Sequence, residues 1–197
     1  SDERTREAFR GAGARVLSVP GSRGTRLAHA AAGATGDVLF FLHADSRPPD
    51  DALALISRSL AEGADAGAFS LAYEDEDRRM RWIAWWANGR SRLGMPFGDQ
   101  GIFCRRSTYE RSGGFRDLSV CDDVDLVRRL RKSGAFVVRP EKTVTSPRRY
   151  REVGTLRQVL RTWRVLAGYY AGVPPETLSR WYEGRQGRQP RSASPGG

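Results

Sequence analysis

Cysteine, lysine and long apolar runs are all scarce in this sequence of 197 residues. Two cysteines, Cys104 and Cys121, are too few for a disulfide framework and lack the spacing of a zinc site. The strongest apolar stretches, 38–42 and 165–173, are much shorter than the roughly 20 residues that cross a bilayer. The first residues are polar and charged and have no apolar core typical of a signal peptide. We therefore expect a cytoplasmic protein without a transmembrane span.

Positive charge is abundant but unevenly distributed. The net charge is +10, and residues 139–197 account for eight of these charges, with 12 Lys+Arg against 4 Asp+Glu. Such a basic segment is compatible with nucleic acid, an anionic membrane or phosphorylated substrates. No stacking platform or recognition helix accompanies the charge, so nucleic acid is the least favoured of the three partners.

Length and apolar content favour one α/β domain. Alternating apolar runs and helix-forming segments predict a mostly parallel, Rossmann-like sheet with helices on both faces. The predicted strands are 14–19, 38–42, 66–73, 101–105 and 135–139. The predicted helices are 24–34, 50–62, 77–93, 122–132, 150–170 and a short helix that ends at residue 182. The domain is therefore expected to span residues 1–182, and residues 183–197, which are poor in apolar side chains, are expected to form a disordered tail.

Two of the predicted helices carry clusters of large apolar residues. Trp82, Trp85 and Trp86 have i, i+3 and i+4 spacing and share one face, which we expect to be core or the wall of a cleft. The helix 150–170 is basic and amphipathic, and its apolar positions are Val153, Leu156, Leu160, Trp163, Val165 and Leu166. Packing on the sheet through Leu156, Leu160 and Trp163 is the simpler interpretation of this helix. The alternative is that the helix makes peripheral contact with the inner face of an anionic membrane.

Polar residues follow predicted strands or stand in loops, where α/β proteins place their sites. These groups are His43 with Asp45, Asp99 with Gln100, and Asp122 with Asp123. Each group has a structural alternative, as a turn, an exposed loop or a helix cap. Arginines at loop positions, Arg23, Arg148 and Arg149, suit the diphosphate of a nucleotide or an anionic acceptor.

The order and spacing of these motifs resemble glycosyltransferase family 2, whose fold is the GT-A fold of nucleotide-diphospho-sugar transferases. The motifs are the stretch 24–45, GDQG at 98–101 and the acidic run DDVDL at 122–126. They look most similar to a bacterial subgroup associated with arsenosugar biosynthesis, over roughly residues 1–182. The resemblance implies an inverting transfer of a sugar from a nucleotide-sugar donor to an acceptor hydroxyl, which in many relatives is lipid-linked.

The resemblance also implies roles for individual residues. Asp45 matches the second acid of the family's Asp-X-Asp motif, which implies that it holds Mg²⁺ or Mn²⁺ against the donor diphosphate. Asp123 matches the general base, which takes a proton from the acceptor hydroxyl. Arg23 matches a basic position near the nucleotide, and Asp99 and Gln100 match positions on the acceptor and sugar side.

Several positions depart from the family pattern. His43 replaces the first acid of Asp-X-Asp, Ala28 stands where asparagine is usual, and Asp122 stands where glutamate is usual. Family members also begin with a strand, a helix and a second strand that this sequence lacks. We therefore expect an N-terminally truncated fragment that binds a nucleotide sugar poorly. The alternative function is a noncatalytic GT-A domain that acts as a binding module.

Overall fold

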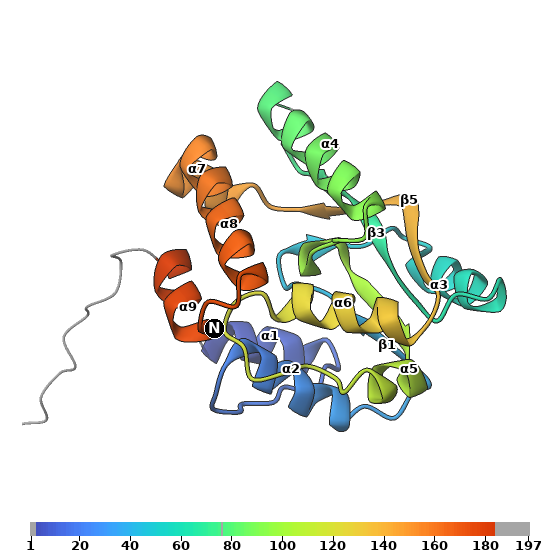
Figure 1. Ribbon diagram of the computed structural model, residues 1–197. Helices are drawn as coiled ribbons and strands as arrows, with labels where there is room; N and C mark the ends of the chain where they lie inside the picture. The colour runs from blue at the N-terminus through green and yellow to red at the C-terminus, as the bar shows by residue number, and fades with distance from the viewer. Residues whose placement is uncertain (1–2, 76, 184–197) are drawn as a thin grey trace, which may run out of the picture.

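The computed structural model describes residues 3–75 and 77–183, and a mixed sheet lies at its centre (Figure 1). The strands of this part of the chain are β1 (Val38–Phe41), β2 (Ser46–Arg47), β3 (Ala66–Tyr73), β4 (Ile102–Arg105) and β5 (Phe136–Thr145). Their order across the sheet is β1-β4-β3-β5-β2. β3 and β5 pair in parallel, whereas β4 pairs antiparallel with both β1 and β3, and β2 pairs antiparallel with β5.

The prediction of a mostly parallel sheet is therefore wrong. β1, β3 and β5 do run in the same direction, but β4 lies between β1 and β3 in the opposite direction. Short local apolar runs predict that strands exist, but strand order is set by packing between distant segments. The pattern therefore did not reveal this insertion.

The predicted strand at 14–19 does not form. This segment is irregular and mostly exposed, and the edge strand β1 pairs only with β4 among the described residues. A strand forms only where its backbone groups pair with a neighbouring strand, and no described strand pairs with this segment, so its apolar residues alone do not make it a strand. Of the predicted strand 14–19, helix 24–34 and strand 38–42, only the helix and the second strand therefore form, as α2 (Arg23–Ala32) and β1.

Helices cover both faces of the sheet, as predicted. In the described residues they are α1 (Glu3–Gly11), α2 (Arg23–Ala32), α3 (Ala52–Ala61), α4 (Arg78–Arg92), α5 (Arg106–Arg111), α6 (Asp122–Ser133), α7 (Arg148–Val153), α8 (Thr155–Tyr170), α9 (Pro175–Glu183) and the 3₁₀ turn η1 (Gly98–Gln100). Successive residues of β4 point to opposite faces. Phe103 packs among the apolar residues of α3, while Ile102 and Cys104 pack with those of α2, α5 and α6.

The predicted helix 150–170 is divided into α7 and α8 at Gly154. This glycine has φ 89° and ψ 133°, a backbone conformation that a helix cannot contain. Val165 and Leu166 are buried, but Leu156, Leu160 and Trp163 are 72%, 60% and 48% exposed. The interpretation that this helix packs on the sheet through Leu156, Leu160 and Trp163 is therefore wrong.

None of the helices within 3–75 and 77–183 is long and apolar enough to cross a membrane. The tail predicted at 183–197 lies outside the described residues apart from Glu183, which ends α9.

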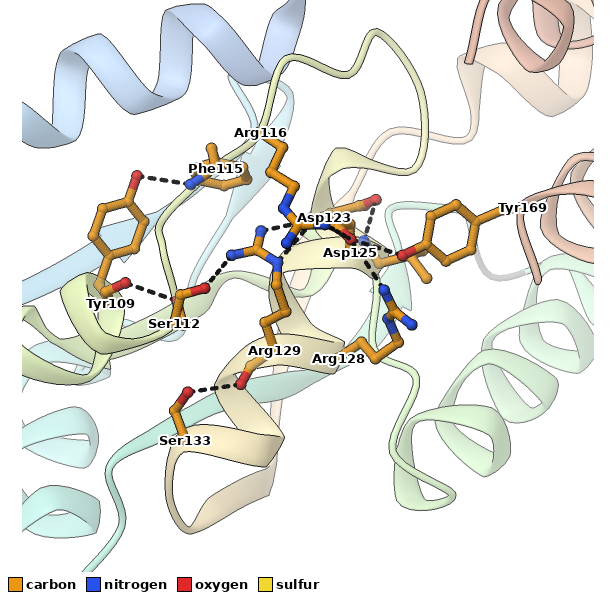
Figure 2. A network of polar contacts seen from close by, with 11 residues as sticks. Tyr109, Ser112, Phe115, Arg116, Asp123, Asp125, Arg128, Arg129, Ser133 and Tyr169 are labelled. Carbon is orange, nitrogen blue, oxygen red and sulfur yellow. Dashed lines mark hydrogen bonds and ion pairs between the residues drawn. The ribbon is translucent and has the colours of Figure 1, made fainter. Parts of the chain in front are cut away.

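A buried carboxylate, Asp125, joins α6 to α8 (Figure 2). The hydroxyl of Tyr169 donates to Oδ1 of Asp125 at 2.8 Å, and Arg129 donates to Oδ2 through Nε at 2.9 Å and Nη2 at 2.7 Å. Arg116 and Arg128 lie within 3.9 and 3.5 Å of Oδ1. Burial acts to raise the pKa of Asp125, but the bonds from Tyr169 and Arg129 outweigh it and lower the pKa. The carboxylate is therefore charged at neutral pH and fixes the first turn of α6.

The Asp125→Ala variant should lose about 3–5 kcal/mol of unfolding free energy, because it leaves the half-buried guanidinium of Arg129 without its carboxylate partner. Tyr169→Phe removes one hydrogen bond and should cost roughly 0.5–3 kcal/mol. Urea unfolding at neutral pH measures both. Equal stability of Asp125→Ala and the parent protein would show that this network does not hold α6 in place.

Candidate active site

A cleft of about 750 Å³, which many charged side chains line and which is called the polar cleft below, opens beside the sheet, within the size range of ligand pockets. It is formed by the segment after β1, η1, the start of α6 and residues of α7, α8 and α9. Eight of the nine residues predicted for the site line it: Arg23, His43, Asp45, Asp99, Asp122, Asp123, Arg148 and Arg149. Asp45 and Asp123, which are far apart in the sequence, therefore face the same cleft.

Gly98 lies where three side chains converge. A Cβ atom at this position would be 2.6 Å from Nε2 of His43, 3.1 Å from Oδ2 of Asp123 and 3.2 Å from Nη2 of Arg23. The Gly98 amide donates to Oδ2 of Asp123 at 2.6 Å, and the Val124 amide donates to Oδ1 at 2.8 Å. The absence of a side chain at Gly98 lets its amide approach the Asp123 carboxylate. The two amides together hold this carboxylate in one orientation, half-buried in the cleft wall.

Arg23 connects His43 to Asp122. Its Nη2 contacts Nε2 of His43, and its Nε lies 3.4 Å from Oδ2 of Asp122. Asp122 is 1% exposed, and among the described residues neither of its oxygens accepts an aligned hydrogen bond, so the ion pair with Arg23 is its principal compensation. Burial and then the charge of Asp123 raise the pKa of Asp122 to about 7, against the opposing effect of Arg23.

His43 is neutral at pH 7. Burial and then the positive charge of Arg23 lower the pKa of its imidazole below the usual 6.5, and Asp123 and Asp45 only partly oppose this. A neutral imidazole can accept a hydrogen bond at Nε2, the atom that Arg23 contacts. The histidine at this position therefore places a neutral group beside Asp45.

Asp99 lies deeper in the cleft, beside Arg90. Its Oδ1 is buried and has no hydrogen-bond partner among the described residues, although the side chain as a whole keeps some exposed area toward the cleft. Burial raises the pKa of Asp99 to about 6, while the charge of Arg90 acts to lower it. The Arg90 guanidinium stacks 3.3 Å from the centroid of the Phe97 ring, which fixes its position.

The mouth of the cleft is positively charged. Arg148 and Arg149 are exposed, and Arg149 stacks 4.1 Å from the centroid of the Tyr182 ring. Asp45 is also exposed, and its backbone carbonyl accepts from the Ser146 amide at 3.3 Å. This bond ties the segment after β1 to the end of β5, so Asp45 and the two arginines border one opening.

Gln100 does not reach the cleft. It is fully buried, and its side-chain oxygen accepts from the Ser91 hydroxyl at 2.7 Å and the Phe97 amide at 3.0 Å. Its amide nitrogen donates to the carbonyl of Phe69 at 2.9 Å. Gln100 therefore holds η1 against β3 and α4, which differs from the ligand contact predicted for it.

Within residues 3–75 and 77–183, no group of three or more His, Cys, Asp or Glu side chains is arranged to hold a metal ion. A cage made only of protein ligands therefore does not fit. Mg²⁺ and similar hard cations are commonly held by one or two carboxylates and the phosphates of a substrate. The exposed carboxylate of Asp45 fits this second arrangement, since Asp123 is engaged by two amides and Asp122 by Arg23.

Aromatic residues of the C-terminal helices also line the cleft, although they were not predicted as site residues. Tyr150 of α7 and Tyr182 of α9 line it, together with Tyr73 at the end of β3. The rings of Tyr73 and Tyr150 meet edge to face with centroids 5.6 Å apart. The sequence offered one signal for Tyr150, namely its position beside Arg148 and Arg149, but none for Tyr182, because helix α9 reaches the cleft only through tertiary packing.

No model of a known protein family matches this chain, and no curated protein matches it in sequence. Among solved structures it is similar to the mannosyltransferase PcManGT from Pyrobaculum calidifontis, described in complex with GDP-Man and Mn²⁺. The two are 19% identical, with a TM-score of 0.61, over 93% of this chain and 57% of that one. The chain thus spans little more than half the length of that protein. The likeness shows that this chain has a fold found in a glycosyltransferase.

The contribution of Asp122 to the free energy of unfolding should fall as the pH rises from about 4 to about 7. The pKa of this carboxyl is raised from 3.8 to about 7 in the folded protein, so the unfolded state releases the proton first as the pH rises. The Asp122→Asn variant should lose this part of the pH dependence. Urea unfolding between pH 5 and pH 8 tests this, with exposed Asp50→Asn as the control. The same slope in all three proteins would contradict a buried, proton-binding Asp122.

Proposed function

We propose that this protein transfers a sugar from a nucleotide-diphospho-sugar to an acceptor hydroxyl, with inversion at the sugar carbon. The observation that carries the proposal is the Asp123 carboxylate, which two backbone amides orient in a cleft with arginines at its mouth. The shared fold with a mannosyltransferase supports glycosyl transfer as the reaction class. The assignment to family 2 rests on the sequence motifs.

Asp123 would act as the general base. Its carboxylate takes the proton of the acceptor hydroxyl as the acceptor oxygen forms a bond to C1 of the sugar. The bond between C1 and the diphosphate oxygen breaks, and the nucleoside diphosphate leaves with the electron pair. One base on the face opposite the leaving group is enough for this single displacement, and it inverts the configuration at C1.

Positive side chains would bind the donor. Arg148 and Arg149 are exposed at the mouth, where guanidinium groups can form paired hydrogen bonds with phosphate oxygens. Arg23 lies further in and is held by His43 and Asp122. Asp45 would hold a divalent cation, Mg²⁺ or Mn²⁺, which when bound would offset the negative charge of the diphosphate. Because His43 is neutral, Asp45 is the negatively charged side chain that the segment after β1 contributes to the cleft.

The Asp123→Asn variant should lose about 100-fold or more of its turnover and keep its donor affinity, because it removes proton transfer but not the arginines. Sugar transfer from UDP-glucose or GDP-mannose measures the turnover, and calorimetry with the same donors measures the affinity. Asp50→Asn, an exposed aspartate outside the cleft, is the matched control. Full turnover in Asp123→Asn would refute the assignment of the base. Donor binding by the parent protein without any turnover would support the noncatalytic binding module instead.

The exposed face of α8 would rest on an anionic membrane. Leu156, Leu160 and Trp163 are 72%, 60% and 48% exposed, and Arg157 and Arg164 are exposed beside them. A basic helix with exposed apolar residues binds at the lipid interface, through apolar burial and attraction to anionic lipid.

Flotation with vesicles that contain phosphatidylserine should recover more protein than flotation with neutral vesicles, and Leu160→Glu should abolish the difference. Equal recovery with both vesicle types would show that α8 does not recognise an anionic surface. Glu152→Gln, which changes a charge on the neighbouring α7, serves as the control and should still float.

A further inference from the structure

A second, mostly apolar pocket of about 240 Å³ lies between α4 and α8, the helices at the top and upper left of Figure 1. Its walls include Trp82, Ile83 and Trp86 from α4 and Val159, Trp163 and Leu166 from α8. At about 30 Å³ per water molecule, this volume holds roughly eight groups the size of water or a methylene. The pocket is therefore large enough for a short alkyl chain or one ring.

This pocket adjoins the polar cleft. Both are lined by Tyr73, Phe97, Asp99, Tyr150, Thr162 and Leu166. Asp99 lies at the junction with an Oδ1 that is buried and without a hydrogen-bond partner among the described residues. Such a group costs free energy unless a ligand or water satisfies it. Asp99, with this unpartnered oxygen, therefore stands between the apolar pocket and the cleft that holds the carboxylate of Asp123.

The aromatic walls of the pocket are incompletely covered. Trp82 is 56% exposed, Trp86 49% and Trp163 48%. Adjacent exposed apolar side chains of this size are characteristic of binding sites, because burying them against a ligand removes their apolar surface from water. Trp85 provides a contrast, since it is 68% exposed on the same helix but does not line the pocket.

We propose that the pocket between α4 and α8 binds the apolar end of the acceptor, an alcohol or glycoside with an alkyl or aryl tail. The hydroxyl end of this acceptor passes Asp99 and reaches Asp123 in the polar cleft. This inference rests on the proposed function, because only a transferase requires an acceptor. It adds to that function the chemical class of the acceptor.

Calorimetry with butyl, hexyl and octyl β-D-glucopyranosides below their micelle concentrations tests the pocket directly. Affinity should rise about threefold to fourfold per added methylene, the gain expected from burying each CH₂. The Trp86→Ala variant should weaken octyl glucoside binding about tenfold or more and leave donor binding unchanged. Trp85→Ala is the matched control, and its effect should be threefold or less even though its ring touches Trp86, with centroids 5.9 Å apart.

Two results would overturn the pocket assignment in favour of unspecific binding to the exposed aromatic face. One is an affinity that does not depend on tail length, and the other is an equal loss of affinity in Trp85→Ala and Trp86→Ala. Either outcome is distinct from failure of the proposed function. Asp123-dependent transfer with no tail-length dependence would refute only the pocket. Tail-dependent glucoside binding in a protein that binds neither UDP-glucose nor GDP-mannose would refute the sugar transfer and show an apolar-ligand site of another kind.

Discussion

The close approach of three chain segments at Gly98 is the constraint on which the candidate site depends. The segment after β1 brings His43, the start of α2 brings Arg23 and the start of α6 brings Asp123, and all three side chains lie within 3.2 Å of where a Cβ of residue 98 would be. A glycine lets its amide reach the Asp123 carboxylate and bond to it. Because this bond uses the backbone, it orients the carboxylate without adding a second charge beside it.

The surrounding fold keeps these segments in place. The network around Asp125 fixes α6 against α8, only two residues from the proposed base (Figure 2). Buried Gln100 fixes η1 on the other side of Gly98 through three hydrogen bonds. Positive charges dominate the mouth, whereas the interior holds carboxyls whose pKa values burial raises, to about 7 for Asp122 and about 6 for Asp99. This separation suits a ligand that has an anionic end outside and hydroxyl groups inside.

Local pattern predicted much of this structure from the sequence. The strand Ala66–Tyr73 and the helices α2, α3, α4 and α6 agree with their predicted segments to within two residues, since periodicity and caps act over a few neighbours. Features that depend on distant partners were not predictable in this way. The antiparallel placement of β4, the unpaired segment 14–19 and the inward position of Gln100 are all decided by tertiary contacts. The break at Gly154 was visible as a glycine in the sequence but was outweighed by the apolar pattern around it.

The amide of Gly98 offers the most direct test of a sugar-transfer site built around Asp123. It can be followed by nitrogen–proton NMR while GDP-mannose or UDP-glucose is added with Mg²⁺. We expect a saturable shift of the Gly98 and Val124 amide signals with one of these donors, and loss of the Gly98 shift in Asp123→Ala. Saturable donor binding that leaves both signals unchanged would place the ligand elsewhere and contradict a donor site at Asp123.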